Sequence, residues 1–239
     1  MALESAAPAW SPALGAVRAV AMGVVAAALP LFLVTSGVRW VALGEGFYVE
    51  EFGKYRVGEV TGLSGDELRR VAHAIVTYFQ SEPQRLNVVV TTPGGPRPLF
   101  NEREIQHMVD VQALMHRVLQ VWAVALLALF VATVALVVPE PASGVGALAR
   151  AAAIGGGIAV LLVGALGLAA FLDFGQLFLR FHLISFTNDL WLLDPTRDRL
   201  IQLFPQGFFF DAALRIAALT VAAGAVILAA SLAALRATR

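Results

Sequence analysis

Two long apolar runs of this 239-residue chain flank the segment LRFHLISFTNDLWLLDPTRDRLIQLFPQGFFFD, residues 179–211. The segment holds one His, one Asn and seven Arg or Asp residues among many aromatic side chains. Aromatic rings mixed with charges are typical of the interface between a bilayer and water. The segment therefore predicts a fold in which two spanning helices are joined by a polar connection at a membrane surface.

The composition is that of an integral membrane protein. Hydrophobic residues make up 59% of the chain and charged residues 14%, with a mean hydropathy of +0.76. The absence of cysteine excludes thiolate chemistry, disulfides and cysteine-ligated metal sites. The formal net charge is zero, so we expect no nucleic-acid partner.

Four apolar stretches are long enough to cross a bilayer, which needs about 20 helical residues. We predict spanning helices at 14–40, 113–138, 148–173 and 212–235. The first is expected to remain as an anchor, because no short cleavage region follows it. The polar regions 44–112 and 175–211 should lie on one side of the membrane. The whole chain, residues 1–239, is thus predicted to be a single all-α membrane domain with four transmembrane helices.

The region between the first two spans should contain short helices and a possible hairpin. Ser64 and Glu67 form a capping-box pattern ahead of an amphipathic helix. The LNVVV run at 86–90 and the PGGP turn at 93–96 predict a hairpin or an extended flap. A second capping pattern at Asn101 predicts one long helix that continues into the second span.

Polar side chains gather on one face of that long helix. At about 100° per residue, Glu104, His107 and Asp110 share a face, whereas His116 projects about 180° away from His107. One pocket therefore cannot use both of these histidines through this helix.

The segment 179–211 is expected to hold two short helices. The chain should bend at Gly175, and helices are predicted over 178–190 and 196–203. Three polar side chains would then share one helical face: His182, Ser185 and Asp189. Because both polar regions lie on the same side, these residues and those near His107 can converge on one site.

Two blocks of this sequence resemble a bacterial family of lipoprotein intramolecular transacylases. The first block is FNEREIQHMVDVQAL at 100–114. The second contains FH at 181–182, ND at 188–189, LDP at 193–195 and LIQLFP at 200–205, and it ends with FFFD at Asp211. The resemblance implies a multi-pass protein of the bacterial cell membrane, with both termini cytoplasmic and the active site at the extracytoplasmic face.

The resemblance also implies a substrate and a reaction. The substrate would be a lipoprotein whose N-terminal cysteine carries a diacylglyceryl group and a free α-amine. An acyl chain would move from the glycerol ester to that amine, giving a lyso-form lipoprotein. We expect a monomer that contacts membrane lipids and uses no cofactor and no metal.

Histidine side chains titrate near neutral pH and suit paired general acid and base steps. His107 and His182 are the candidate catalytic residues. Candidate supporting residues, which could orient a histidine or serve the oxyanion, are Glu104, Asp110, Asn188, Asp189, Ser185 and Trp191. Candidate substrate-binding residues are Phe181, Arg180 and Arg199.

Other readings of the same residues stay open. Glu104 and His107 form an ExxH pair, which with His182 and Asp189 could make a metal-dependent ester or amide hydrolase. Ser185 and His182 could make a serine hydrolase. A non-catalytic membrane scaffold or a transporter is a third alternative, although transport is disfavoured because the spans carry almost no charge away from their ends.

Overall fold

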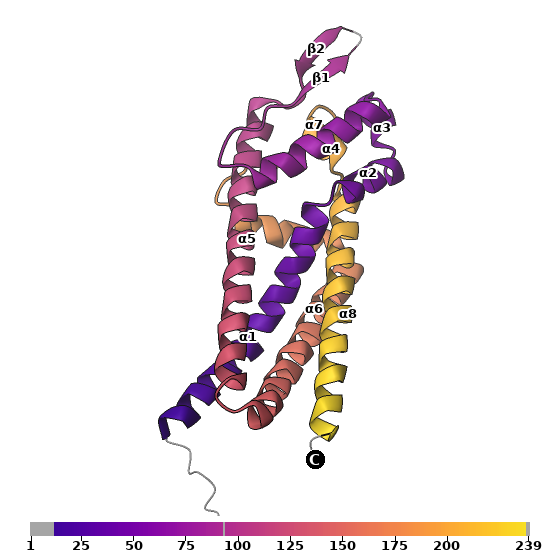
Figure 1. Ribbon diagram of the computed structural model, residues 1–239. Helices are drawn as coiled ribbons and strands as arrows, with labels where there is room; N and C mark the ends of the chain where they lie inside the picture. The colour runs from indigo at the N-terminus through magenta and orange to yellow at the C-terminus, as the bar shows by residue number, and fades with distance from the viewer. Residues whose placement is uncertain (1–11, 93, 238–239) are drawn as a thin grey trace, which may run out of the picture. The chain divides into compact units, whose positions relative to one another are not determined.

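The computed structural model describes residues 12–92 and 94–237, most of which are helical. Four of its helices are long and apolar enough to cross a membrane (Figure 1). They are α1 (Pro12–Ala42), α5 (Glu102–Val137), α6 (Pro141–Ser185) and α8 (Gln206–Ala237). The predicted class of a helical protein with four transmembrane segments is confirmed.

The chain divides into two compact units, which we describe separately. One unit comprises the described residues up to Leu33, Trp122–Leu162, and those from Thr220 onward. The other comprises Val34–Val121 and Val163–Leu219. Every candidate site residue belongs to the second unit.

Small residues allow the helices of the first unit to pack closely. A Cβ at Gly155 would come within 3.0 Å of the Leu29 side chain, and one at Gly156 within 2.8 Å of the Gly224 carbonyl oxygen. Close backbone approach is a usual source of helix association in membranes. At Gly157 the space is open, so only two of these three consecutive glycines serve the contact.

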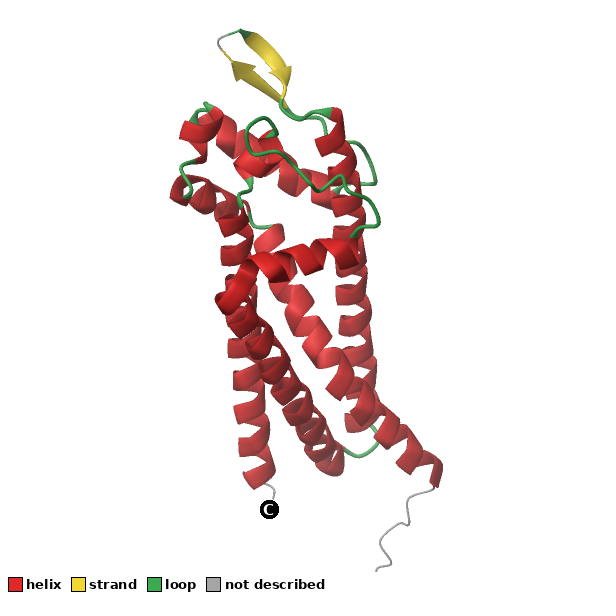
Figure 2. Cartoon of the chain, turned by 180° about the vertical axis from the view of Figure 1, so that it is seen from behind, coloured by secondary structure: helices red, strands yellow, loops and turns green. Residues whose placement is uncertain are grey.

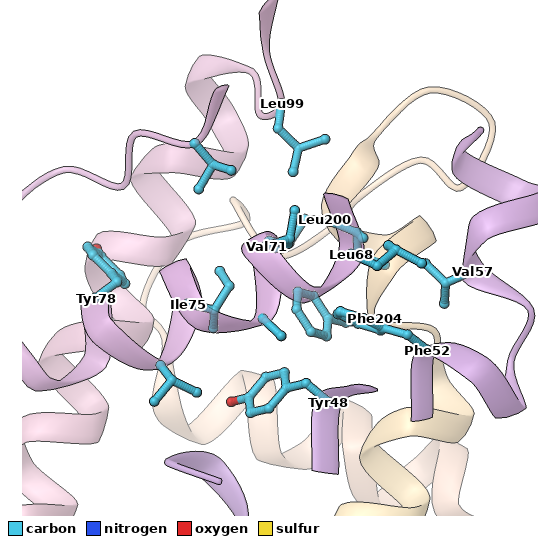
Figure 3. Packing of buried hydrophobic residues seen from close by; sticks show 14 of the residues in the cluster. Tyr48, Phe52, Val57, Leu68, Val71, Ile75, Tyr78, Leu99, Leu200 and Phe204 are labelled. Atoms are coloured by element: carbon cyan, nitrogen blue, oxygen red, sulfur yellow. The ribbon is translucent and has the colours of Figure 1, made fainter. Parts of the chain in front are cut away.

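The second unit has a core built around α4 (Gly65–Gln80), together with α2 (Glu45–Lys54), α3 (Val57–Thr61) and α7 (Arg199–Leu203). Ser64 Oγ accepts a hydrogen bond from Glu67 N at 3.2 Å and so caps α4, as predicted. The predicted apolar face of α4 is buried, and Figure 3 shows Val71 and Ile75 lying among core side chains from other elements.

Aromatic rings of α2 pack inward in this unit. The ring centroid of Tyr48 lies 6.0 Å from that of Phe204, and Phe52 lies 5.6 Å from Phe204 and 6.3 Å from Phe208. Burial raises the pKa of the Tyr48 hydroxyl well above its usual range. The aromatic side chains of α2 therefore pack against neighbouring helices.

A charged cluster fastens α2 to the start of α8. Asp211 Oδ2 lies 2.5 Å from both Lys54 Nζ and Tyr55 Oη. Glu51 is only 2% exposed, and burial together with the neighbouring Asp211 raises the pKa of the Glu51 carboxyl to about 7. Gly207 is needed here, because a Cβ would lie 2.5 Å from the Tyr55 ring.

The predicted hairpin is present as β1 (Val89–Thr92) and β2 (Gly95–Pro98), drawn as two arrows in Figure 2. The strands are antiparallel, with Val90 opposite Arg97. β1 is also attached to α4, since Thr91 N donates to Glu67 Oε1 at 3.2 Å. The expected turn includes residue 93, which lies outside the described residues.

The helix α6 changes direction at Asp173, where φ is −154° and ψ is 83°. Beyond this residue the helix runs across the direction of the preceding turns (Figure 1). Asp173 Oδ1 accepts from Gln176 N at 3.0 Å and so caps the next turns. The expected bend therefore lies two residues before Gly175, at a side chain that can cap.

Two predicted helices in the segment 179–211 are shorter than expected. The first ends at Ser185, because Asn188 Oδ1 accepts from Leu190 N and turns the chain. Asp189 therefore lies in a loop and does not share a helical face with His182. The second begins at Arg199 instead of residue 196, because Asp194 accepts from Thr196 N and forms a turn first.

Candidate active site

His107 on α5 and His182 near the end of α6 lie side by side in the second unit. Their ring centroids are 6.3 Å apart, with an angle of 30° between the ring planes. The residues are 7% and 8% exposed. Two blocks that are 75 residues apart in sequence thus supply two buried imidazoles to one place.

Aromatic side chains surround the His182 imidazole, and one of them also contacts His107. Phe178 and Trp191 lie 4.3 Å and 4.9 Å from the His182 ring, and Phe181 lies 5.3 Å from it. Phe186 contacts both histidines, at 5.1 Å from His107 and 5.7 Å from His182. The rings make a largely apolar wall that limits the access of water to the imidazoles.

The ring nitrogens of the two histidines have different surroundings. His182 Nδ1 lies 2.8 Å from the Phe178 carbonyl oxygen, which can only accept, so Nδ1 carries the hydrogen. In the neutral ring Nε2 is then an acceptor. His107 Nδ1 is buried and has no hydrogen-bond partner among the residues that the structure describes.

The loop after α6 is attached to α5 by polar side chains. Asn188 Nδ2 donates to Asp110 Oδ2 at 2.9 Å. Arg103 donates to the Asp189 carbonyl oxygen and lies 3.7 Å from its carboxylate. Trp191 Nε1 donates to the Asn188 carbonyl oxygen at 2.9 Å, so the same loop holds Trp191 against His182.

A second attachment joins the first turn of α5 to the start of α7. Glu104 is 1% exposed, and its two oxygens accept from Leu200 N at 2.6 Å and Asn101 N at 2.7 Å. Asn101 Nδ2 donates to Asp198 Oδ1 at 2.9 Å, and Asp198 Oδ2 accepts from Asp194 N at 2.7 Å. The carboxylates of Glu104 and Asp198 are therefore engaged in holding the backbone.

The hydrogen bonds of Glu104 are relevant to the alternative of a metal-dependent hydrolase. Both oxygens of Glu104, the acidic member of the ExxH pair, accept backbone N–H groups. The described residues include no group of three His, Cys, Asp or Glu side chains placed to hold a metal ion. The donor set thus gives the metal-hydrolase reading little support.

Some predicted residues lie outside this enclosure. Arg180 is exposed on α6, and Ser185 ends that helix without a hydrogen bond to His182 in the described chain. Arg199 Nη1 donates to the Thr61 carbonyl oxygen at 3.2 Å, which joins α7 to α3. In the part of the chain that the structure describes, no histidine is therefore placed to act as a general base for Ser185, which disfavours the serine-hydrolase alternative. The contact of Arg199 is a structural one between two helices.

Several contacting residues were not singled out from the sequence. Phe178 and Phe186 lie four residues before and after His182, and Arg103 lies four residues before His107. Helical spacing around each histidine is the signal that could have identified them. Asp198 offered no such signal, because its partner Asn101 is 97 residues away.

Among solved structures, the chain is similar to the membrane-integral lipoprotein intramolecular transacylase Lit from Bacillus cereus. The two chains are 19% identical, the match covers 90% of this chain and 94% of that one, and the TM-score is 0.71. Structures of two variants of that protein, with one histidine changed to alanine or to arginine, match at 18% identity and a TM-score of 0.70. Both of these matches cover 94% of this chain, with 96% and 95% of the others. At this level of identity the likeness shows the shared fold.

Comparison of the sequence with known proteins and families gives further information. No curated protein matches the chain. The model of the family described as lipoprotein intramolecular transacylase Lit matches residues 24–209, which is well over half of the chain. The chain therefore belongs to the lipoprotein intramolecular transacylase family.

Proposed function

We propose that this membrane protein moves an acyl chain within a diacylglyceryl-modified lipoprotein. The chain leaves the glycerol ester and joins the α-amine of the N-terminal cysteine, giving a lyso-form lipoprotein. The observation that carries the proposal is the pair His107 and His182, buried 6.3 Å apart in an aromatic enclosure of a family member.

The reaction moves protons off the attacking nitrogen and onto the leaving oxygen, which two imidazoles can mediate. One histidine takes a proton from the α-ammonium, whose ordinary pKa is about 8, and releases it to solvent. The amine nitrogen then attacks the ester carbonyl carbon, forms the new C–N bond and gives its second proton to the same histidine. As the C–O bond breaks, the other histidine, in its protonated form, gives a proton to the glyceryl oxygen. No acyl-enzyme is required, and the net result is one proton on the glyceryl oxygen and one released to solvent.

The hydrogen bond at His182 supports such a role. The Phe178 carbonyl holds Nδ1–H and thereby fixes the tautomer and the ring orientation. It would also stabilise the protonated form of His182, in the way that an orienting acceptor assists other catalytic histidines. Nε2 is then the nitrogen of His182 that exchanges a proton with the substrate.

The aromatic enclosure favours acyl transfer over hydrolysis. The rings of Phe178, Phe181, Phe186 and Trp191 limit water near the ester. The donor and the acceptor belong to one molecule, and effective molarities of about 10⁵ M or more are known for well-oriented intramolecular reactions. Positioning can therefore replace covalent catalysis.

The other candidate residues take supporting places in this proposal. Glu104, Asn188 and Asp189 hold the loop and the first turn of α5. The exposed Arg180 would contact lipid head groups. We further propose a monomer with both termini in the cytoplasm and the histidine pair at the extracytoplasmic face of a bacterial cell membrane.

The test is mass spectrometry of lipoprotein N-termini from bacteria that lack N-acyltransferase, with and without this protein. We expect N-acylated lyso-lipoprotein only when the protein is present, and its loss in the His107→Ala and His182→Ala variants. His73→Ala is the matched control, because His73 is exposed on α4 and pairs with Glu45. Unchanged diacylated N-termini with well-expressed wild-type protein would contradict the proposal.

A further inference from the structure

We propose that the carboxylate of Asp110 binds the α-ammonium group of the lipoprotein substrate and holds it beside His107. The inference rests on the proposed function and deepens it, because it names the group that receives one part of that substrate. The ligand class is a primary ammonium adjacent to a lipid-bearing thioether.

Asp110 is placed where such a ligand would meet a base. It follows His107 by three residues on α5, so the two side chains share one helical face. Its charge acts on the His107 imidazole. Asp110 is half-buried, and Oδ2 accepts from Asn188 Nδ2 at 2.9 Å, which orients the carboxylate.

The second carboxylate oxygen of Asp110, Oδ1, accepts no hydrogen bond from the described residues. In residues 12–92 and 94–237, no group donates to Oδ1, and no Lys or Arg forms an ion pair with Asp110. By contrast, Asp189 is paired with Arg103, and Glu104 is occupied by backbone N–H groups. Asp110 is thus a carboxylate beside the histidine pair that lacks a cation.

An independent observation at His107 points to the same ligand. His107 is a buried residue, 7% exposed, and its Nδ1 has no partner in the described part of the protein. A buried polar atom without a partner costs free energy unless a ligand satisfies it. An ammonium group has three N–H donors, so it can reach Asp110 and His107 at the same time.

In the described chain, the surroundings of Asp110 do not supply the set of ligands that a metal cation would need. The described residues hold no three-residue metal cluster. Other titratable or charged groups in this part of the unit are Arg103 and His107 on α5, Tyr78 on α4, His182 on α6, and Asp189 in the loop.

The placement also orients the rest of the substrate. With the nitrogen beside Asp110 and His107, the glycerol ester lies toward His182. There the rings of Phe178, Phe181 and Trp191 suit glyceryl and acyl groups. This contact selects substrates with a free, charged amine. After acylation the nitrogen carries no charge and is no longer attracted to Asp110, and loss of this contact favours release of the product.

The experiment compares two dialkylglyceryl-cysteinyl peptides whose ether links cannot transfer, one with a free α-amine and one with hydrogen in its place. Affinities of the full-length protein in detergent are measured at about pH 7 and at about pH 9, below and above the ordinary pKa of an α-amine. The variants are Asp110→Asn, which keeps an acceptor for Asn188, and Asp66→Asn, which changes an exposed carboxylate on α4.

We expect the wild-type protein and Asp66→Asn to prefer the amine by at least about tenfold at the lower pH, the size of one charged hydrogen bond. The preference should shrink at the higher pH and be largely lost in Asp110→Asn, whose affinity for the des-amino peptide stays unchanged. A preserved preference in Asp110→Asn overturns the proposal. If that variant fails to fold, absence of any amine preference in the wild-type protein overturns it as well. Acyl transfer to a diacyl peptide, measured in parallel, tests the proposed function separately.

Discussion

Removing the Glu104 carboxylate should destabilise the second unit far more than removing an exposed carboxylate on the same turn of α5. Glu104 is buried, and its oxygens accept from Leu200 N at 2.6 Å and Asn101 N at 2.7 Å. The comparison residue is Glu102, which forms an exposed ion pair with Arg85. Both substitutions remove one negative charge from the first turn, so the effect on the helix dipole is shared.

The magnitude follows from the two hydrogen bonds. Each hydrogen bond to a charged acceptor contributes about 1.5–3 kcal/mol, so Glu104→Ala should lower the free energy of unfolding by about 3–6 kcal/mol. Glu104→Gln keeps one acceptor oxygen but places an NH₂ group against the second backbone N–H, so about half of that loss is expected. Glu102→Ala should have little effect, because exposed ion pairs are weak.

The assay is thermal unfolding of purified protein in detergent, followed by circular dichroism, together with acyl transfer at a temperature where all variants are folded. We expect the order wild type, Glu102→Ala, Glu104→Gln and Glu104→Ala in decreasing stability. Acyl transfer should fall in the two Glu104 variants, because the loop that holds Trp191 is then less well fixed. Equal midpoints for Glu102→Ala and Glu104→Ala would refute the reasoning.

Three further predictions concern pH, topology and the path of the acyl chain. Burial raises the pKa of Glu51 from 4.5 to about 7, so the stability from this group is complete below about pH 4.5 and is lost as the pH rises through about 7. The midpoint of thermal unfolding should therefore shift less between these two pH values for Glu51→Gln than for the wild type. An equal shift would show that Glu51 is not the group involved. Cysteines at Gly65 and Thr196 should both react with an impermeant thiol reagent on intact spheroplasts, and reaction of only one would separate the two polar regions. A mixture of one lipoprotein labelled in its acyl chains and another labelled in its peptide should give no doubly labelled product, whereas crossover would contradict an intramolecular transfer.

Much of this fold could be predicted from the sequence because the signals are local. Apolar length predicts the spanning helices, and the spacing Ser64 to Glu67 predicts the cap of α4. The convergence of His107 and His182 followed from helical angles and from the argument that both regions lie on one side. These inferences need only the geometry of one helix or the length of one segment.

The remainder depends on hydrogen bonds of individual side chains, some of them to residues far away in the sequence. The spacing of its polar residues extends the helix predicted over 178–190 too far. Thr187, Asn188 and Asp189 are weak helix formers, and the turn at Asn188 is also held by a hydrogen bond to Asp110, which periodicity does not reveal. The bend lies at Asp173 because a carboxylate there can cap the following turns, whereas Gly175 offers only conformational freedom. Periodicity does not carry this information.

The attachments of the loop to α5 differ in burial, and this difference bears on how a substrate would reach the two histidines under the proposed function. At the base of the loop, Asp198 is 2% exposed and accepts from Asn101 and from the Asp194 backbone. At its tip the contacts are exposed: Asn188 donates to Asp110, and Arg103 donates to the Asp189 carbonyl oxygen and lies near its carboxylate. Exposed polar contacts contribute less to stability than buried ones. Since Trp191 bonds to the tip at Asn188, separation of the tip from α5 would move one wall of the histidine enclosure while the base stays in place. Under the proposed function, such a movement would give a diacylglyceryl group a route to His182 that leaves the helices holding the two imidazoles in place.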